Sequence, residues 1–176
     1  MSVASLHPAP AIYREEQYFA WWIYALLSST FVIVGFLHIW GSNRRPQAVE
    51  LVKAHGALEM IELGGVAVAT ILLVGVLRMT TLVTPTDVRV WFGLIPTYRK
   101  FIAIGAIQRV EVVEYRPILD YGGWGIRFGR DGERVFNARG SRGVRLFLAD
   151  GSKYLIGSQN PEELAGAINE TIRLRS

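Results

Sequence analysis

The chain has 176 residues, of which 51% are hydrophobic and 19% are charged, and its formal net charge is +4. This length leaves room for one modest domain beside any membrane segment. The sequence contains no cysteine, which excludes disulfides, thiolate nucleophiles and thiolate metal ligands. The composition therefore indicates a small protein that combines an apolar membrane part with a soluble part and has no cysteine chemistry.

Residues 1–18 are expected to form an N-terminal tail, and a charge-free run of 22 residues follows at 19–40. A helix of that length is roughly 33 Å long, enough to cross a hydrocarbon core of about 30 Å. The run lacks the cleavage site of a signal peptide. Aromatic side chains near its ends suit the headgroup level of a bilayer. These expected interface anchors are Trp21, Trp22, Tyr24 and Trp40.

A second apolar run at residues 63–77 is too short to span a membrane unaided, because it makes only about 22 Å of helix. It reaches a spanning length over residues 59–80 if Arg78 extends its charge to the interface. The segment between the runs has the pattern of an amphipathic interfacial helix. We therefore expect two transmembrane helices within residues 19–80, with a buried core helix as the alternative for the second.

From residue 81 the hydrophobic period becomes alternating, and turn signals separate the alternating segments. The pattern predicts seven or eight strands, depending on whether the first two form one bent strand. Their expected ranges are 81–84, 88–92, 98–102, 107–115, 125–128, 134–138, 144–148 and 154–157. The Asp150–Gly151 pair predicts a hairpin with a type I′ turn between the last two.

The end of the chain has the pattern of an amphipathic helix. Asn160 is placed to cap it and Pro161 to occupy its first turn. Leu164, Ile168 and Ile172 follow at intervals of four residues, so they share one face. We expect this face to pack onto the sheet.

Residues 80–170 resemble the bacterial PH-like (pleckstrin-homology-like) domains that follow two transmembrane helices in many small membrane proteins. The segments that carry the resemblance are TDVRVWFGLIP, IAIGAIQRVEVVEY, GGWGIRF and GVRLFLADGSKYLIGSQNPEELAGAI. The resemblance implies that residues 81–176 form an antiparallel barrel of about seven strands, capped by a C-terminal helix. It also implies a binding or scaffolding role without catalysis, and related domains include assembly proteins of photosynthetic complexes. It implies no particular site residues.

Residues 78–176 hold 15 Lys or Arg against 10 Asp or Glu, a net charge of +5. Six arginines are expected to face a partner or lipid: Arg127, Arg130, Arg134, Arg139, Arg142 and Arg145. Three interpretations stay open, namely an ordinary solvated strand face, a surface for an acidic partner, and a surface for anionic headgroups. Nucleic acid is not expected as a partner, because the aromatic residues alternate into the core instead of forming a stacking platform.

No catalytic, cofactor or metal site is expected. The segment GGWGIRF lacks the third glycine of a dinucleotide-binding motif. His38 is the one candidate pigment ligand, because imidazole can ligate a metal within a helix, but no second ligand stands at helical spacing.

These observations predict a non-catalytic structural, scaffolding or assembly subunit of a larger bacterial membrane complex, with energy-transducing and photosynthetic complexes as examples. It would bind other integral membrane subunits and the lipid bilayer. The alternative is a membrane-anchored module that senses anionic headgroups. The expected location is the bacterial inner (cytoplasmic) membrane, as a multi-pass protein. The basic domain is expected on the cytoplasmic side, although positive charges flank both sides of the helices equally.

Overall fold

The computed structural model describes residues 10–42, 64, 65, 68, 71, 72, 75, 77–94, 98–129 and 131–175. The chain divides into two compact units. The first contains residues 1–18 and 77–176, and the second contains residues 19–76. The strands and the two helices α3 and α4 belong to the first unit, and helix α1 belongs to the second.

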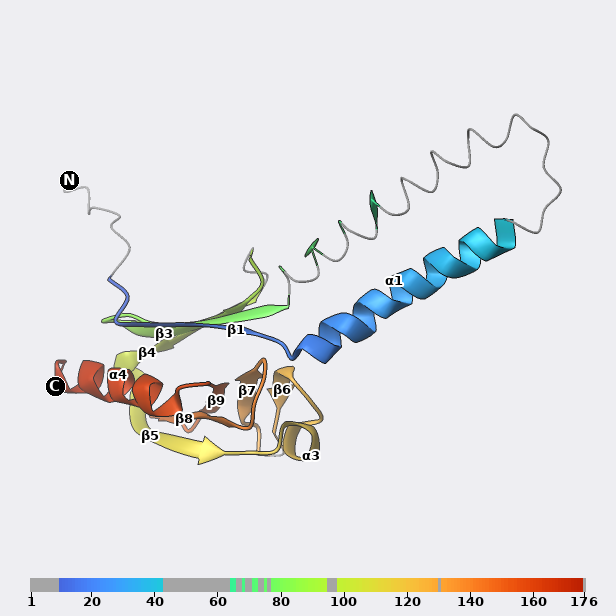
Figure 1. Cartoon of the computed structure of the whole chain (residues 1–176). Coiled ribbons are helices and arrows are strands. Elements are labelled where there is room, and N and C mark those ends of the chain that lie inside the picture. Colours follow the sequence, from blue (N-terminus) through green and yellow to red (C-terminus); the bar gives the residue numbers. More distant parts are fainter. Residues whose placement is uncertain are drawn as a thin grey trace. The chain divides into compact units, whose positions relative to one another are not determined.

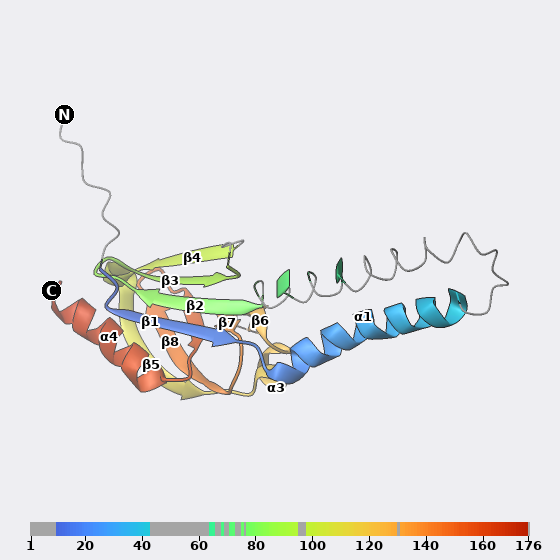
Figure 2. The same ribbon diagram turned by 45° about the horizontal axis from the view of Figure 1, so that its top comes forward.

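The first unit contains a four-stranded antiparallel sheet in the order β1-β2-β3-β4. The strands are β1 (Tyr13–Tyr18), β2 (Arg78–Val83), β3 (Asp87–Phe92) and β4 (Tyr98–Ala103). Strands β1 and β2 lie side by side (Figure 2), and in their register Tyr18 at the end of β1 is opposite Arg78 at the start of β2. Residues 19–77 are therefore an insertion between two neighbouring strands.

A 3-10 turn, η1 (Ile104–Ala106), leads into a five-stranded sheet in the order β5-β8-β9-β7-β6. The strands are β5 (Ile107–Glu114), β6 (Gly125–Phe128), β7 (Arg134–Asn137), β8 (Arg142–Leu148) and β9 (Lys153–Gly157). Helix α3 (Pro117–Tyr121) connects β5 and β6 (Figure 1). Strands β7 and β9 are parallel, and the other pairs in this sheet are antiparallel.

The main core lies between the two sheets. Ring contacts join them directly, since Tyr98 of β4 lies 6.0 Å from Phe136 of β7, centroid to centroid. Lys100 of β4 also places its ammonium 4.8 Å from the ring centroid of Tyr154 on β9. Fully buried aliphatic side chains from both sheets fill the space, among them Val88, Val90, Ile102, Val144, Leu146 and Ile156. Removal of this apolar surface from water is the main stabilising contribution.

Helix α4 (Pro161–Arg173) packs against β5, β8 and η1. It buries Leu164, Ala165, Ile168 and Thr171, so the predicted amphipathic helix is confirmed. Ile172, expected on the buried face, is only half-buried, and Thr171 is buried instead. The expected side-chain cap by Asn160 is wrong. Instead, the backbone N–H of Asn160 donates to the Ser158 hydroxyl at 3.0 Å.

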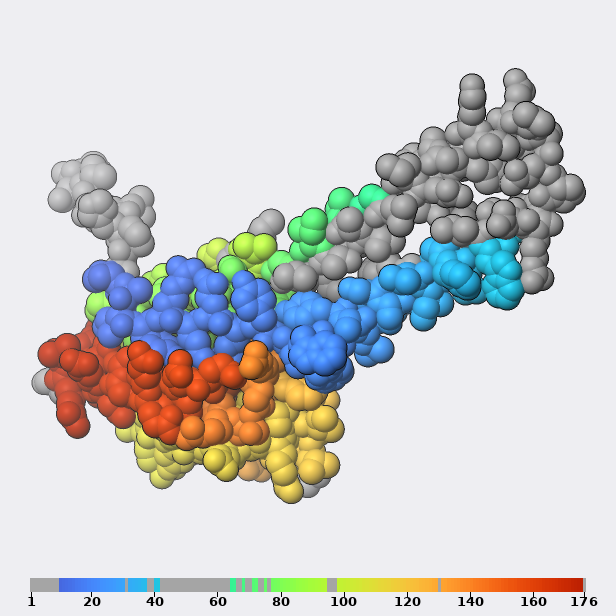
Figure 3. Space-filling model, viewed as in Figure 1, coloured from blue at the N-terminus to red at the C-terminus, as the bar shows by residue number. Residues whose placement is uncertain are grey.

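Two polar side chains on the inner face of β1 attach this strand to the end of β9. Glu15 is 8% exposed. Its carboxylate accepts hydrogen bonds from the Tyr13 hydroxyl at 2.9 Å, the Ser158 hydroxyl at 2.7 Å and the Gln159 N–H at 2.7 Å. Gln17 donates from Nε2 to the Gly157 carbonyl at 2.7 Å. Figure 3 shows the N-terminal strand, in blue, against the C-terminal segment, in red.

The eight strands expected after residue 80 are confirmed, with ends displaced by a few residues. A barrel of about seven antiparallel strands is nevertheless wrong. Within the described residues there are nine strands in two sheets, and one pair is parallel. The additional strand, β1, lies in the segment expected to be a tail, where Glu15 and Gln17 conceal the usual apolar alternation of a buried strand face.

The hairpin at Asp150–Gly151 is confirmed, but its type I′ turn is wrong. That turn requires a positive φ at both central residues. Gly151 has a φ of 82°, whereas no described residue other than glycine has a positive φ. The carboxylate of Asp150 instead accepts a hydrogen bond from the Ser152 N–H at 2.9 Å.

Helix α1 (Trp21–Ser42) is the only long helix in the described part of the second unit. No helix among the described residues combines the length and hydropathy that a membrane crossing requires. This finding contradicts the predicted two-span hairpin and the multi-pass location in the bacterial inner membrane.

The predicted second span is wrong at its C-terminal end for a further reason. Arg78, Met79 and Thr80 belong to β2, where Met79 and Thr80 are fully buried. They cannot extend the short apolar run of residues 63–77. The interfacial segment expected before that run lies outside the described residues.

Replacement of Glu15 by alanine should lower the free energy of unfolding by about 3 kcal/mol, because two buried hydrogen-bond donors and one partly buried donor lose their acceptor. Urea unfolding of the full chain measures this loss. The control is Glu170→Ala on the exposed side of α4, which should change stability by less than about 0.5 kcal/mol. Equal losses in the two variants would show that the Glu15 carboxylate does not hold β1 in place.

Candidate functional site

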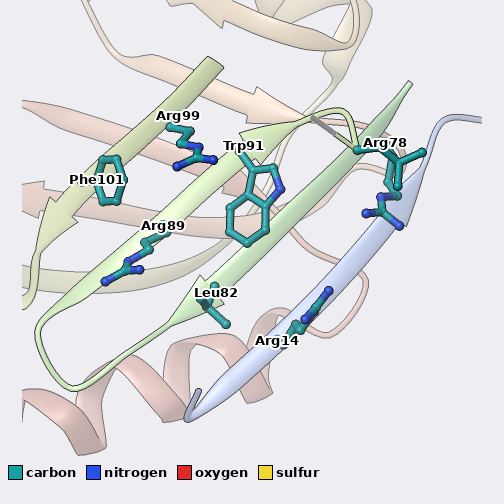
Figure 4. A pocket seen from close by; sticks show the side chains of 8 residues that line it. Arg14, Arg78, Leu82, Arg89, Trp91, Arg99 and Phe101 are labelled. Carbon is teal, nitrogen blue, oxygen red and sulfur yellow. The ribbon is translucent and has the colours of Figure 1, made fainter. Parts of the chain in front are cut away.

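The outer face of the four-stranded sheet carries a groove of about 330 Å³. All four strands contribute to it, and we call it the arginine groove. Its lining residues are Arg14, Arg78, Leu82, Arg89, Trp91, Leu94, Arg99 and Phe101. Figure 4 shows these side chains standing on one side of the sheet, with Trp91 near the centre and Arg14 and Phe101 toward opposite edges. The site therefore combines cationic and aromatic groups on a sheet surface.

Strand alternation and register build the arginine groove. Val88 and Val90 of β3 are fully buried, so Arg89 and Trp91 beside them point to the opposite, outer face. The register then aligns outward residues across the sheet in two rows. One row is Arg14, Leu82, Arg89 and Phe101, and the other is Glu16, Thr80, Trp91 and Arg99.

Two carboxylates partly neutralise the arginines of this face. Glu16 contacts both Arg14 and Arg78, with 3.0 Å between Arg78 Nη1 and Glu16 Oε2. Asp87 pairs with Arg89 at 2.5 Å, and the Arg89 guanidinium lies 5.5 Å from the Phe101 ring centroid. Four arginines against two carboxylates leave an excess of two positive charges.

Arg99 differs from the other three arginines. No described residue forms a hydrogen bond or an ion pair with its side chain, and it is exposed at the edge strand β4. Thr80, on the same outer face of β2, is fully buried, and its hydroxyl has no hydrogen-bond partner among the described residues. The Nε of Arg78 is also buried and also has no hydrogen-bond partner among the described residues. Considering the described residues alone, the face therefore offers both a guanidinium without a counter-ion and buried polar atoms without a hydrogen-bond partner.

The Asp87–Arg89 pair keeps its charges over a wide pH range. The hydrogen bond from Arg89 lowers the pKa of the Asp87 carboxyl, and hydrogen bonds from Thr84 and Thr86 lower it further, against the opposing effect of burial. The hydrogen bond to Asp87 in turn raises the pKa of Arg89. The pair holds the Arg89 guanidinium in a fixed position beside Phe101.

A second cavity, of about 530 Å³, lies by the five-stranded sheet. Its polar centre is a cluster of Tyr121, Glu133 and Arg145. Arg145 Nε lies 2.6 Å from Glu133 Oε1, and the Tyr121 hydroxyl donates to Glu133 Oε2 at 2.7 Å. Burial and the bond to Glu133 raise the pKa of Tyr121 to about 12. The three groups satisfy one another, so the cluster resembles a structural network more than an acid–base pair.

The six arginines between residues 127 and 145 do not gather on one surface. Arg127 lies on β6 and donates to the Trp124 carbonyl at 3.0 Å. Arg134 lies on β7, opposite Phe128 in the register, and its guanidinium is 5.1 Å from that ring. In the register, Arg127 is opposite Val135, the residue that follows Arg134 in β7. Because neighbouring residues of a strand point to opposite faces, Arg127 and Arg134 project from opposite faces of the sheet.

Two of the remaining four members, Arg142 and Arg145, form ion pairs. Arg142 contacts Glu162, and its Nε lies 3.7 Å from Glu114. Arg145 belongs to the cluster with Glu133. Arg139 is exposed in the turn before β8. Arg130 lies outside the described residues.

The residues expected as membrane-interface anchors lie in α1. Trp21 is 79% exposed, and the rings of Trp40 and Phe36 are 6.0 Å apart, centroid to centroid. Trp22 and Tyr24 occupy the first turn and a half of the same helix. His38 also lies in α1, but its side chain is outside the described part of the structure. Among the described side chains, no group of three His, Asp or Glu is placed to hold a metal ion.

The sequence interpretation missed the arginine groove. Its arginines come from four different strands, one from each, so no single segment holds an unusual number of them. The available signal was the alternation within each strand, such as Arg89 and Trp91 alternating with buried valines. Only the register shows that these positions are neighbours.

No protein-family model matches the sequence, and no curated protein matches it. The expected resemblance to PH-like domains is therefore corrected. The structure itself departs from that expectation, because its first strand precedes the inserted second unit and its five-stranded sheet contains the parallel β7–β9 pair. The fold defines a β-rich protein of two sheets with one packed C-terminal helix.

The Tyr121 phenol should titrate at about pH 12, against about 10 for an ordinary tyrosine. Glu133→Gln should move this pKa toward 10, because both the hydrogen bond to Glu133 and its negative charge raise it. Nuclear magnetic resonance of ring-labelled tyrosine measures the titration, and Tyr121→Phe identifies the signal. Titration of Tyr121 near pH 10 in the unmodified chain would show that the cluster is not formed.

Asp87→Asn should lower stability by no more than about 1 kcal/mol at pH 7. The lowered pKa of Asp87 means that its contribution is present above the ordinary carboxyl range, near pH 4, and is lost as the pH falls through the lowered value. Urea unfolding at a series of pH values should therefore show a difference at pH 7 that disappears in strong acid. A difference independent of pH would mean that the ion pair is not its source.

Proposed function

We propose that this protein is a non-catalytic assembly subunit that binds partner subunits of a larger complex. The observation that carries the proposal is helix α1. It has 22 residues, none of them charged, and most of its described large side chains are exposed. Those that are more than half exposed are Trp21, Leu26, Val32, Ile33, Val34, Phe36, Leu37 and Trp40.

The exposed apolar side chains of α1 favour contact with a partner. A helix that is apolar on every side is stable when other apolar elements surround it. Contiguous apolar surface on this scale also marks interaction sites in proteins. Helices of partner subunits would supply the required surroundings for α1.

The chemistry of the first unit supports a binding role over a catalytic one. The sequence contains no cysteine. The cluster of Tyr121, Glu133 and Arg145 has its polar groups directed at one another. The arginine groove, in contrast, exposes charged and aromatic groups that can contact a second molecule. We therefore assign it as a second contact surface for the partner.

The test is a native purification of the tagged full chain from its source cells in mild detergent, followed by sizing and quantitative mass spectrometry. The proposal expects co-migration with partner subunits at fixed stoichiometry. Val34→Lys should reduce the partner yield by about tenfold, because it places a charge on the apolar surface of α1. The matched control is Glu170→Lys on α4, which should leave the yield unchanged.

Two results would contradict the proposal. One is an unmodified chain that migrates alone under these conditions. The other is a partner yield that is equal in Val34→Lys and Glu170→Lys.

A further inference from the structure

We propose that the arginine groove binds an acidic segment of a partner protein in which carboxylates flank an aromatic or large apolar side chain. The inference rests on the proposed function, because it names the chemistry of the partner for one of the two contact surfaces. It depends on three features of the groove. These are an arginine without a counter-ion among the described residues, a set of apolar side chains, and a small excess of positive charge.

Within the described part of the chain, Arg99 is the arginine of the groove that has no counter-ion. The other three arginines of the groove already contact Glu16 or Asp87, whereas Arg99 has no such counter-ion among the described residues. A guanidinium can bind a carboxylate with two parallel hydrogen bonds, the strongest kind of polar contact in interfaces. Arg99 is therefore the expected contact for the first carboxylate of the ligand.

The apolar part of the groove consists of Leu82, Trp91, Leu94 and Phe101. Leu94 is 64% exposed and Phe101 is 52% exposed, while Leu82 and Trp91 are half-buried. Tryptophan and arginine dominate the binding energy of protein interfaces, especially where they lie together at the centre of a contact. Trp91 and Arg99 are direct neighbours in the register. An aromatic ligand side chain against Trp91 would place an adjacent carboxylate near Arg99.

The groove is ordered before any ligand binds. Asp87 holds Arg89 beside Phe101, and Glu16 holds Arg78. Side chains fixed in this way lose little conformational entropy on binding, so more of the contact energy remains as affinity.

The charge of the face favours a carboxylate segment over a phosphate-rich surface. Its excess is only two positive charges, because Glu16 and Asp87 stand among the arginines. A dense array of phosphates would meet these two carboxylates directly, and like charges repel. A segment with one or two carboxylates beside an apolar residue matches both the charge and the volume of about 330 Å³.

The experiment measures binding of the full chain, in mild detergent, to three fluorescein-labelled peptides by anisotropy. The probe is Asp-Glu-Phe-Asp-Glu, and the comparison peptides replace either its acids by Asn and Gln or its Phe by Ala. We expect both comparison peptides to bind about tenfold more weakly than the probe. Equal binding of the amide peptide would overturn the assignment of a carboxylate ligand.

Variants of the chain locate the site. Arg99→Glu and Trp91→Ala should each weaken binding of the acidic peptide by about tenfold, whereas Trp91→Phe should restore most of it. The matched control is Arg139→Glu, which makes the same charge change at an exposed turn outside the groove. Equal losses in Arg99→Glu and Arg139→Glu would mean that binding follows net charge and not the groove, and would overturn the inference.

Vesicle binding and native purification distinguish the possible failures. If vesicles of phosphatidylserine and phosphatidylcholine bind in a manner that depends on Arg99 while the acidic peptide does not bind, the groove is a lipid site and the inference fails. If the unmodified chain does not bind the peptide although its native complex is intact, the inference fails while the proposed function stands. A chain that binds the peptide through Arg99 but has no partner in native extracts contradicts the proposed function instead.

Discussion

The buried carboxylate of Glu15 is the interaction on which the described fold depends most. It joins the first strand of the chain to Ser158 and Gln159, just before α4, and the neighbouring Gln17 adds a bond to Gly157. A carboxylate removed from water is costly unless donors surround it, and here three donors do so. These bonds hold β1 in the register that pairs Glu15 with Thr81 of β2.

The position of β1 decides the composition of the outer face. With Tyr13, Glu15 and Gln17 turned inward, Arg14 and Glu16 must point outward. Glu16 then orders Arg78, and Arg14 closes one end of the arginine groove. The same strand leads directly into the second unit, whose other end returns at β2 opposite Tyr18. The short strand β1 therefore determines both the composition of the arginine groove and the point at which the second unit is inserted.

Alternation and turn residues were sufficient to predict the strands after residue 80, because positions such as Val88 and Val90 combine strict alternation with complete burial. The same reasoning missed β1, since two of its three inward residues are polar and their partners lie far along the chain. It also extended an apolar run into β2, because Met79 suits a helix as well as a strand. The groove was not predictable, as it exists only once four strands are in register.

The most direct measurement is amide hydrogen exchange across β1 in the full chain. If Glu15 anchors this strand, the β1 amides that face β2 should exchange as slowly as those of β2 and β3, and Glu15→Ala should release β1 selectively. Exchange of these amides at the rate of an unstructured segment would show that residues 13–18 are not part of the sheet. The arginine groove would then lack Arg14 and Glu16, and the account would be contradicted.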